Sequence, residues 1–491
     1  MNGTPSHIVR RVFLTAGLLG LCMSAGAAVA ADGGSVVLVR GAELYLGNGA
    51  VVHNGALLIE DGVIRAVGNS LPVPSGANVV ELDGACVTPG LIDANASLEP
   101  TDVMTPGARG PRRVLHDFFC GHHGRGRLHA CCGSTCPNVF EHASGKTCTI
   151  CGFPNARPQM AAGTRLLVSL TEQSSEVVPH LRVIDTVNLR SPDLTRLLAG
   201  GVTTVYVSPD SAAVIGAQGA IVRTGGPLQD RIVSRTGAVK AVMGSDPFSR
   251  GPRNNLPFRK DVSFHSRRPT TRMGVAWVFR KALYDTKRFE QGVEVQGADV
   301  PSVAAMQTLS NVLSGDIPLR IQARKQYDIL SAIRLAAEFG LSFVLEEATE
   351  ASRCLPEIKD ANLSVVYGPL FITPTGYRSY SGEAGRARLH TMGDLLAAGI
   401  ETALTANDLR DEDGLARQAM YAIRYGVSPG DALQSVTKTP AKLLGLDREI
   451  GTLEVGKRGD VVVWSGEPFT ATSRPVVVLI GGEIVYDRRE G

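Results

Sequence analysis

The fold is decided by VTPGLIDANASLEP, the stretch from Val87 to Pro100. In it a short apolar run leads into two polar residues, Asn95 and Ser97. Such a run is typical of a short buried strand.

Upstream of this stretch, residues 35–87 alternate short apolar runs with turn signals, and a matching set stands near the C-terminus as DVVVWSG, PVVVLIGG and EIVYD. This spacing predicts a small antiparallel β unit with glycine-containing hairpins. Between the two ends, helical patterns alternate with short apolar strands. That alternation indicates an α/β architecture with a parallel sheet.

Several helix boundaries in this middle part can be predicted from single residues. Ser191 is expected to be an N-cap with proline at the first helical position, and Gly200 is expected to end that helix in the left-handed conformation. Thr391 is predicted to cap a second helix, with Asp394 three residues on, and Ser428 to open a late one.

Strand following helix over about 350 residues favours a (β/α)8 barrel over an open doubly wound sheet, because no G-x-G-x-x-G fingerprint follows an early strand. The segments CVTPGLID and IGTLEVGKRGDVVVWSGEP resemble those of the amidohydrolase superfamily, especially its imidazolonepropionase-like and cyclic-amide hydrolase branch. The resemblance implies a TIM-type barrel at residues 91–447 and a composite β-sandwich from residues 31–90 and 448–491. It also implies hydrolysis of carbon–nitrogen bonds at the carboxyl ends of the barrel strands.

Hydrolysis in that superfamily needs one or two divalent metals, held by imidazoles and carboxylates, which activate a bound water. By resemblance, the ligand positions fall on Asn95 and Ser97 in the first strand, Gln322 in the fifth, Glu347 in the sixth, and Asp408 (or, with a one-residue shift, Asn407) after the last, while Lys240 stands about where some relatives use a bridging lysine. Four imidazoles are thus replaced by an amide, a hydroxyl, an amide and a carboxylate.

Amide and hydroxyl oxygens bind Zn²⁺ poorly, and Glu347 with Asp408 would hold Mg²⁺ or Ca²⁺ only weakly. The favoured interpretation is a hydrogen-bonded polar plug at the barrel mouth, with Lys240 paired to a carboxylate, and a working metal centre is the alternative. Two functions stay open. One is a hydrolase of cyclic or acyl amides that uses Lys240, Glu347 and Asp408 as an altered site. The other is a noncatalytic binding or scaffold protein, with a small amide-type ligand as the expected partner.

The first thirty residues have the composition of a signal peptide, with Ala28-Val29-Ala30 as the cleavage site. Within them RRVFLT, Arg10 to Thr15, resembles a twin-arginine signal, and a Sec signal is the alternative. The chain is therefore expected to be exported to the periplasm or beyond. No later apolar run reaches the length of about 18 residues that spans a bilayer, so the mature chain is expected to be soluble.

Residues 107–165 form an insertion that departs from the family pattern and holds six of the nine cysteines and five of the ten histidines. Its spacing, Cys132-x3-Cys136 and Cys148-x2-Cys151 with eleven residues between, is typical of a zinc ribbon in which four thiolates hold one structural Zn²⁺. Disulfides, which export favours, and free or otherwise bound thiols are the alternatives.

The remaining composition is that of an ordinary globular protein, with 44% apolar and 20% charged residues. Cys86 and Cys354 are isolated in the sequence and are expected to be small buried apolar residues. A formal net charge of +3 without a basic stripe gives no electrostatic case for binding nucleic acid. A homo-oligomer is compatible with the sequence.

Overall fold

The computed structural model describes residues 36–82, 84–98, 175–249, 269–297, 299–370, 389–411 and 414–489. The predicted signal peptide at residues 1–30 and the cysteine-rich insertion at residues 107–165 lie outside the described residues. The described residues belong to one compact unit.

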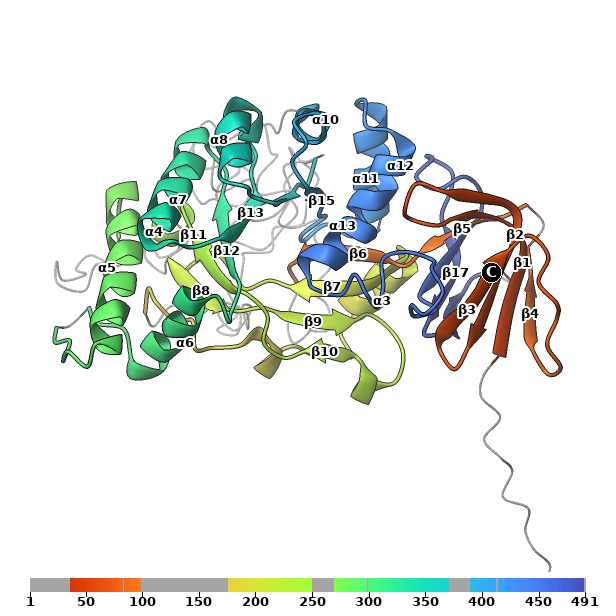
Figure 1. The fold of residues 1–491 in the computed structure, drawn as a ribbon, viewed down its shortest axis with the longest axis horizontal. Coiled ribbons are helices and arrows are strands. Elements are labelled where there is room, and N and C mark those ends of the chain that lie inside the picture. Colours follow the sequence, from red (N-terminus) through yellow and green to blue (C-terminus); the bar gives the residue numbers. More distant parts are fainter. Residues whose placement is uncertain are drawn as a thin grey trace, which may run out of the picture. The chain divides into compact units, whose positions relative to one another are not determined.

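An eight-stranded sheet, called here the terminal sheet, is built from both ends of the chain (Figure 1). Its strands are β1 (Val36–Tyr45), β2 (Val51–Glu60), β3 (Val63–Gly68), β4 (Asn78–Glu81), β5 (Cys86–Pro89), β16 (Val461–Trp464), β17 (Pro475–Ile480) and β18 (Glu483–Asp487). They follow the order β18-β17-β16-β5-β1-β2-β3, with β4 also paired to β1. The expected antiparallel pairing is correct for the hairpins, including that of β1 with β2. It is wrong for the other edge of β1, where β4 and β5 pair with β1 in parallel. The reason is that residues 69–77 return the chain to the other side of β1 after β3.

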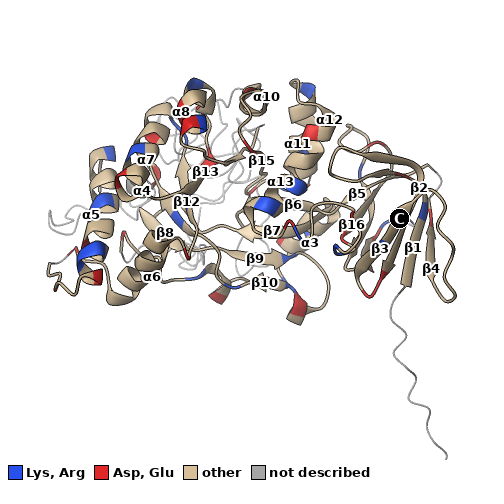
Figure 2. Ribbon diagram, viewed as in Figure 1, with Lys and Arg blue, Asp and Glu red and all other residues tan. Residues whose placement is uncertain are grey.

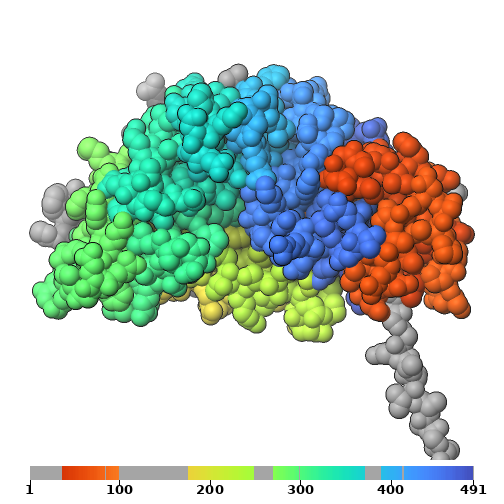
Figure 3. Space-filling model, in the orientation of Figure 1, coloured from red at the N-terminus to blue at the C-terminus, as the bar shows by residue number. Residues whose placement is uncertain are grey.

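The two faces of the terminal sheet belong to different cores. In β16, Val461 and Val463 pack in a core confined to this sheet, whereas Val462 and Trp464 pack in the large core that continues into the rest of the molecule. This alternation follows from the period of two of a strand. The indole Nε1 of Trp464 donates to Thr88 Oγ1 at 2.9 Å, which ties the C-terminal strand to β5. In Figure 3 the surfaces of the N-terminal and C-terminal segments adjoin.

Two further sheets carry the central part of the chain. The four-stranded sheet has the order β10-β9-β7-β6 and the six-stranded sheet the order β15-β14-β13-β12-β11-β8. Their strands are β6 (Leu91–Ala96), β7 (Val202–Val207), β8 (Ile215–Gln218), β9 (Ala220–Arg223), β10 (Ile232–Ser234), β11 (Val239–Val242), β12 (Leu319–Ala323), β13 (Phe343–Glu347), β14 (Val365–Tyr367) and β15 (Thr402–Leu404). Strands β6 and β7 are parallel to each other, and so are β11 to β15.

The two central sheets are connected at two places, at the β8–β9 segment and between β6 and β15. Only Gly219 separates β8 from β9, so one continuous segment pairs with β11 in one sheet and with β7 in the other, antiparallel in both. A Cβ on Gly219 would lie 2.2 Å from the phenol of Tyr206, so only glycine fits at this junction. At the other end the Ser97 N–H donates to the carbonyl of Asn407, beyond β15, at 3.1 Å. The regular repeat of parallel strand and helix holds from β11 to β15 and is interrupted by the antiparallel β8–β9 segment.

The helices of the described ranges lie between the strands of this central part and between β15 and β16 (Figure 1). They are α3 (Pro192–Ala199), α4 (Asp246–Ser249), α5 (Arg272–Glu290), α6 (Val303–Ser314), α7 (Gln326–Phe339), α8 (Leu355–Asp360), α10 (Thr391–Ala397), α11 (Leu415–Arg424), α12 (Pro429–Ser435) and α13 (Lys438–Leu443). Figure 2 shows charged residues of both signs along α5, α7 and α8. None of the helices in the described ranges is long and apolar enough to cross a membrane.

The predicted helix caps are partly correct. Ser191 accepts a hydrogen bond from the N–H of Asp193 at 3.2 Å, and Ser428 accepts one from Asp431 at 3.0 Å, so both N-cap predictions are confirmed. The prediction for Gly200 is wrong, because its φ is −83° and the left-handed residue is Gly201, one position later. The predicted cap at Thr391 is also wrong: helix α10 begins at this residue, and its hydroxyl makes no cap contact.

The two isolated cysteines, Cys86 and Cys354, are free and buried as expected. Burial is also the first cause that raises the pKa of the Cys354 thiol to about 12. A neutral thiol is a poor nucleophile, which agrees with a packing role for this residue.

Candidate functional site

The residues singled out from the sequence lie at or near the carboxyl ends of neighbouring strands. Gln322 in β12 pairs in register with Glu346 of β13, so Glu347 is one position further on. Lys240 of β11 pairs with Arg320, two residues before Gln322. Lys240 therefore lies further from the carboxyl ends of the strands than Gln322 does. Parallel strands bring these ends to one edge of the sheet, which is where α/β proteins place their sites.

Lys240 belongs to a buried ionic cluster. Its ammonium donates to Ser208 Oγ at 2.9 Å and lies 3.3 Å from the carboxylate of Glu346. The same carboxylate lies 3.1 Å from Arg320 Nε, and the side chains of Lys240, Arg320 and Glu346 are all at most 4% exposed. Neither contact to Glu346 has hydrogen-bond geometry, so both are ion pairs only.

Arg320 extends this cluster to the first strand. Its Nη1 donates to the carbonyl of Ala94 in β6 at 2.7 Å, and its guanidinium lies 4.1 Å from the ring centroid of Tyr206 in β7. Burial, as the largest cause, raises the pKa of Tyr206 to about 12, and the phenol donates to the carbonyl of Ala238 at 3.0 Å. The phenol is therefore neutral, and the charges of this cluster are those of Lys240, Arg320 and Glu346.

A second buried cluster surrounds Asp246, which follows β11. Its carboxylate accepts hydrogen bonds from Ser211 Oγ at 2.8 Å, Gln322 Nε2 at 2.9 Å and Arg324 Nη1 at 2.8 Å. Arg324 also pairs through Nε with Glu347. The guanidinium of Arg324 thus lies between two carboxylates.

The charged form of Arg324 is strongly favoured. Burial by itself lowers the pKa of this guanidinium, but the attraction of Glu347 and Asp246 outweighs burial and leaves the pKa raised. Gln322 and Glu347, two of the positions named for metal ligands, are therefore engaged with Asp246 and with this cation.

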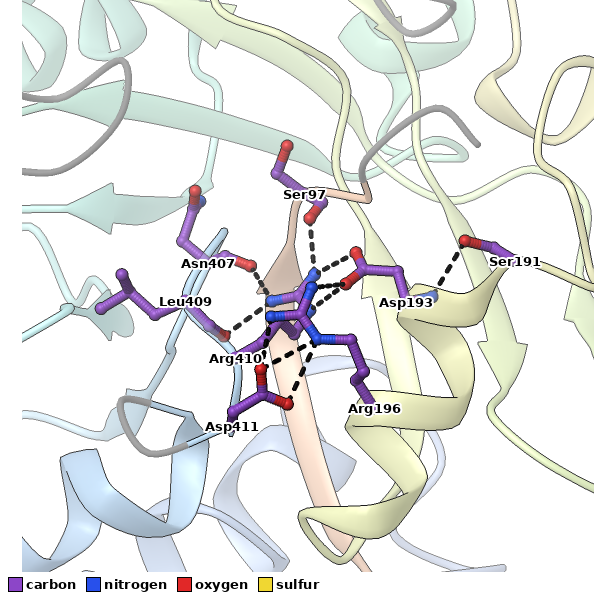
Figure 4. A network of polar contacts seen from close by, with 8 residues as sticks. All are labelled: Ser97, Ser191, Asp193, Arg196, Asn407, Leu409, Arg410 and Asp411. Atoms are coloured by element: carbon purple, nitrogen blue, oxygen red, sulfur yellow. Dashed lines mark hydrogen bonds and ion pairs between the residues drawn. The ribbon is translucent and has the colours of Figure 1, made fainter. Parts of the chain in front are cut away.

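A third cluster fixes the junction between β6 and β15 (Figure 4). Arg410 donates from Nη2 to the carbonyl of Ser97 at 2.6 Å and from Nη1 to the carbonyl of Asn407 at 2.7 Å. The same guanidinium binds the carboxylate of Asp193 through two contacts of 3.0 and 3.1 Å. Arg196 in turn binds Asp411, which lies on the same loop as Arg410. Ser97 and Asn407 are thus held by their backbone carbonyls.

Asp93 completes this junction from inside β6. Its buried carboxylate accepts hydrogen bonds from Thr405 Oγ1 at 2.6 Å and from the N–H groups of Asn95 and Ala406, each at 3.0 Å. Burial raises the pKa of Asp93, and these hydrogen bonds oppose that shift. Asp408, the last residue predicted for the site, is half-buried beyond β15.

Asn95 differs from the other predicted site residues. Its side chain is completely buried, and neither its Nδ2 nor its Oδ1 has a hydrogen-bond partner. Its backbone is fully engaged, because its carbonyl accepts from Thr405 Oγ1 at 3.0 Å and from Asn407 Nδ2 at 3.2 Å.

The described side chains at these positions include no imidazole. Asn95, Ser97, Gln322 and Glu347 stand at the positions that the resemblance gives to imidazoles, and Glu347 is paired with Arg324. Of the histidines in the described ranges, His53 lies in β2, while His180 and His390 lie outside the strands. Across the same ranges, no group of three or more His, Cys, Asp or Glu side chains could hold a metal ion. The predicted zinc ligands Cys132, Cys136, Cys148 and Cys151 lie outside the described residues.

The sequence interpretation missed most of the residues that form the clusters, namely Asp193, Asp246, Arg320, Arg324, Glu346 and Arg410. A signal for two of them was present in RIQAR, residues 320–324, which is entirely buried in the structure. Arg320 and Arg324 are four positions apart along an extended segment, so they lie on one face, and buried arginines require buried counterions.

Comparisons with known proteins agree on one family. A family model described as Amidohydrolase family matches residues 397–486. Amidohydrolase tasK of Hapsidospora irregularis is 23% identical over 336 residues, which are 64% of this chain and 34% of that protein. Imidazolonepropionase of Maricaulis maris (strain MCS10) is 31% identical over 157 residues, 31% of this chain and 36% of that protein. The matched parts are about a third of the length of these two curated relatives.

Among solved structures, an amidohydrolase from Thermotoga maritima MSB8 superposes with a TM-score of 0.69 at 27% identity. The match covers 92% of this chain and all of that one.

Proposed function

The chain belongs to the amidohydrolase superfamily, and from this premise we propose that it binds a small amide-type ligand in its barrel without metal-dependent hydrolysis. By resemblance the ancestral activity is hydrolysis of carbon–nitrogen bonds. In this proposal the two joined sheets act as one (β/α)8-type barrel with a single irregular segment at β8–β9. The ligand end is the edge at which β6, β12, β13 and β15 finish.

The observation that carries the proposal is the position of Arg324 between Asp246 and Glu347. A divalent cation bound to Glu347 would lie close to this guanidinium. At an effective dielectric constant of about 20, two unit charges about 4 Å apart repel by about 4 kcal/mol, and a divalent ion doubles that energy. Arg324 therefore supplies the positive charge that a metal would bring, and its own charge opposes the binding of a divalent cation at Glu347.

The alternative is a hydrolase that uses Lys240, Glu347 and Asp408. Two of these three groups are already neutralised by partners, since Lys240 pairs with Glu346 and Glu347 with Arg324. A general base must be within hydrogen-bond reach of the proton that it removes, and a carboxylate held by a buried guanidinium is a weak base. These contacts favour the noncatalytic function.

The experiment is a hydrolysis assay on metal-reloaded protein. The mature chain is stripped with a chelator, reloaded in turn with Zn²⁺, Mn²⁺ and Mg²⁺, and assayed on cyclic ureas, hydantoins and N-acyl amino acids. We expect no metal-dependent turnover above that of the stripped protein. Turnover that requires metal and disappears in Asp408→Ala, but not in the exposed-site control Arg334→Met, would establish the hydrolase instead.

We also propose that the chain is exported and that its insertion holds one structural Zn²⁺. The sequence of residues 1–30 and the spacing of Cys132, Cys136, Cys148 and Cys151 support these two proposals. Changing Arg10 and Arg11 to lysine keeps the charge and should stop export if the twin-arginine machinery reads the signal. Unchanged export of that variant would identify a Sec substrate.

A further inference from the structure

Helix α5 carries large apolar side chains on its outer face. Its inner face holds the buried residues Phe279 and Leu283, and the helix contacts α6 and α7 (Figure 1). On the outer face, Met273 is 80% exposed, Trp277 58% and Tyr284 48%. The outer face of an amphipathic surface helix is normally polar, and exposed apolar groups gathered on one face are typical of an interaction site.

These three side chains lie in one line with an exposed arginine, Arg288. Met273, Trp277, Tyr284 and Arg288 are four, seven and four positions apart, and at about 100° per residue their directions around the helix differ by at most about 60°. We call these four residues the α5 stripe. It extends for about 22 Å along the helix axis, at a rise of about 1.5 Å per residue. Met, Trp, Tyr and Arg are enriched in protein–protein interfaces, whereas Lys and Glu are depleted there.

The tyrosine of the stripe is held in place before any partner binds. The phenol of Tyr284 donates to Glu338 Oε1 at 2.9 Å, and its ring meets the ring of Phe339 edge-on, with 5.0 Å between the centroids. Glu338 is itself fixed, because it accepts from Arg280 Nε at 2.9 Å. A partner that packs on Tyr284 therefore loses little free energy in ordering this side chain.

The charges of α5 favour a protein partner over an anionic lipid surface. An amphipathic helix that binds such a surface needs free cations beside its aromatic rings. Three cations of α5 are already neutralised, since Arg272, Arg280 and Lys281 each form an ion pair with a carboxylate of the chain. Paired cations attract anionic lipids only weakly, so the exposed rings are better covered by another protein surface.

The stripe is complementary to a second copy of itself. The indole of Trp277 and the guanidinium of Arg288 are eleven residues apart, about 16 Å along the axis, and do not meet within one helix. Two antiparallel α5 helices related by a two-fold axis between residues 282 and 283 bring Trp277 of each copy opposite Arg288 of the other. The same axis brings Met273 beside Val293 of the other copy, which is 41% exposed, and brings the two Tyr284 side chains close together.

We propose that the α5 stripe is the centre of a homodimer interface in which two copies of the chain pack their α5 helices antiparallel about a two-fold axis. A two-fold interface is self-complementary, so each contact forms twice, including the cation–π contact of Trp277 with Arg288. Large side chains of this kind bury about 150–250 Å² each, so the exposed parts of Met273, Trp277 and Tyr284 contribute roughly 400 Å² per copy. That is about half of the roughly 800 Å² per partner that a stable interface buries, and the remaining outer face of α5 with Val293 supplies further area.

The test is sedimentation velocity of the full mature protein from low to high micromolar concentration. The wild type should be a dimer, and Trp277→Glu should be a monomer. Arg288→Glu should raise the dissociation constant of the dimer by about tenfold or more, because both cation–π contacts are lost. Val455→Glu adds the same charge at a residue that is 65% exposed outside α5, and this control should remain a dimer.

Fluorescence quenching by acrylamide locates the interface independently. The chain has two tryptophans, and Trp464 is only 1% exposed, so quenching reports on Trp277. Quenching should be weak in the wild-type dimer and stronger in Arg288→Glu.

A wild type that is monomeric at every concentration would overturn the proposal, and so would a dimer whose dissociation constant is unchanged in both Trp277→Glu and Arg288→Glu. A monomer that sediments with phosphatidylglycerol vesicles, and no longer does so in Trp277→Glu, would assign the stripe to a lipid surface instead.

Discussion

Replacing Arg324 by methionine removes a cation that, in the described part of the chain, binds both Asp246 and Glu347. The two carboxylates, 1% and 4% exposed, would remain buried without that partner. Breaking a buried ion pair by removing one member typically costs about 3–5 kcal/mol, and methionine has nearly the length of the arginine stem, so little of this loss comes from packing. We therefore expect Arg324→Met to lower the free energy of unfolding by about 3–5 kcal/mol near neutral pH.

The loss should depend on pH in a defined direction. In the wild type, the raised pKa of Arg324 means that its contribution to stability is fully present at neutral pH and is lost only in strong alkali, above the ordinary pKa of a guanidinium. Removing this guanidinium favours the neutral form of the carboxyl groups of Asp246 and Glu347 in the folded variant, compared with the folded wild type. The folded variant then binds more protons than the folded wild type, so the stability that the variant loses grows as the pH rises. The difference in the free energy of unfolding between variant and wild type should become smaller toward about pH 5.

The assay is urea unfolding followed by far-UV circular dichroism at about pH 5 and about pH 8. Arg334→Met, an exposed change on α7, is the control and should stay within about 0.5 kcal/mol of the wild type. Combining Arg324→Met with Asp246→Asn and Glu347→Gln should recover much of the loss, because the two charges that Arg324 balanced are then removed as well. A loss below about 1 kcal/mol that is the same at both pH values would refute the reasoning.

Three further outcomes are expected. Asp193→Asn should weaken the hold on Arg410 and destabilise the junction of β6 and β15 by about 2 kcal/mol, seen as a lower urea midpoint, and an unchanged midpoint would contradict this. Asn95→His combined with Ser97→His should not produce metal-dependent hydrolysis in the reloaded protein, because the other ligand positions remain occupied; measurable turnover would contradict the account of the site. Cys148→Ser should remove about one tightly held zinc per chain and expose the insertion to protease, while the rest of the protein keeps its melting temperature. Disulfide-linked peptides from the insertion of a zinc-free wild type would exclude the zinc ribbon.

The family and the α/β architecture could be predicted from the sequence because they depend on local patterns. The segments at both ends carry the turn residues and apolar runs of the terminal sheet, and the caps at Ser191 and Ser428 depend only on the residues beside them. The antiparallel β8–β9 segment could not be predicted in this way. The segment passes from one sheet to the other at Gly219, which packs closely against Tyr206 of β7, and that contact joins residues far from each other's local pattern.

The positions of the candidate site residues could be predicted from the sequence, but the ion-pair partners of their side chains could not. Lys240, Gln322 and Glu347 stand near the strand ends, as expected, yet which carboxylate takes which cation depends on strand register. A shift of one residue separates Glu346, the partner of Lys240, from Glu347, the partner of Arg324. No pattern within a single strand specifies that difference, because every strand of the cluster is buried on both faces.

Titration of the mature protein with Mn²⁺, followed by electron paramagnetic resonance, tests the central claim most directly. Manganese prefers carboxylate, carbonyl and water ligands over thiolates, so it reports on the site at the strand ends rather than on the cysteine-rich insertion. With Arg324 between Asp246 and Glu347, all of the added Mn²⁺ should give the signal of the free ion at micromolar protein. Binding of one Mn²⁺ per chain, lost in Asp408→Ala, would contradict the account.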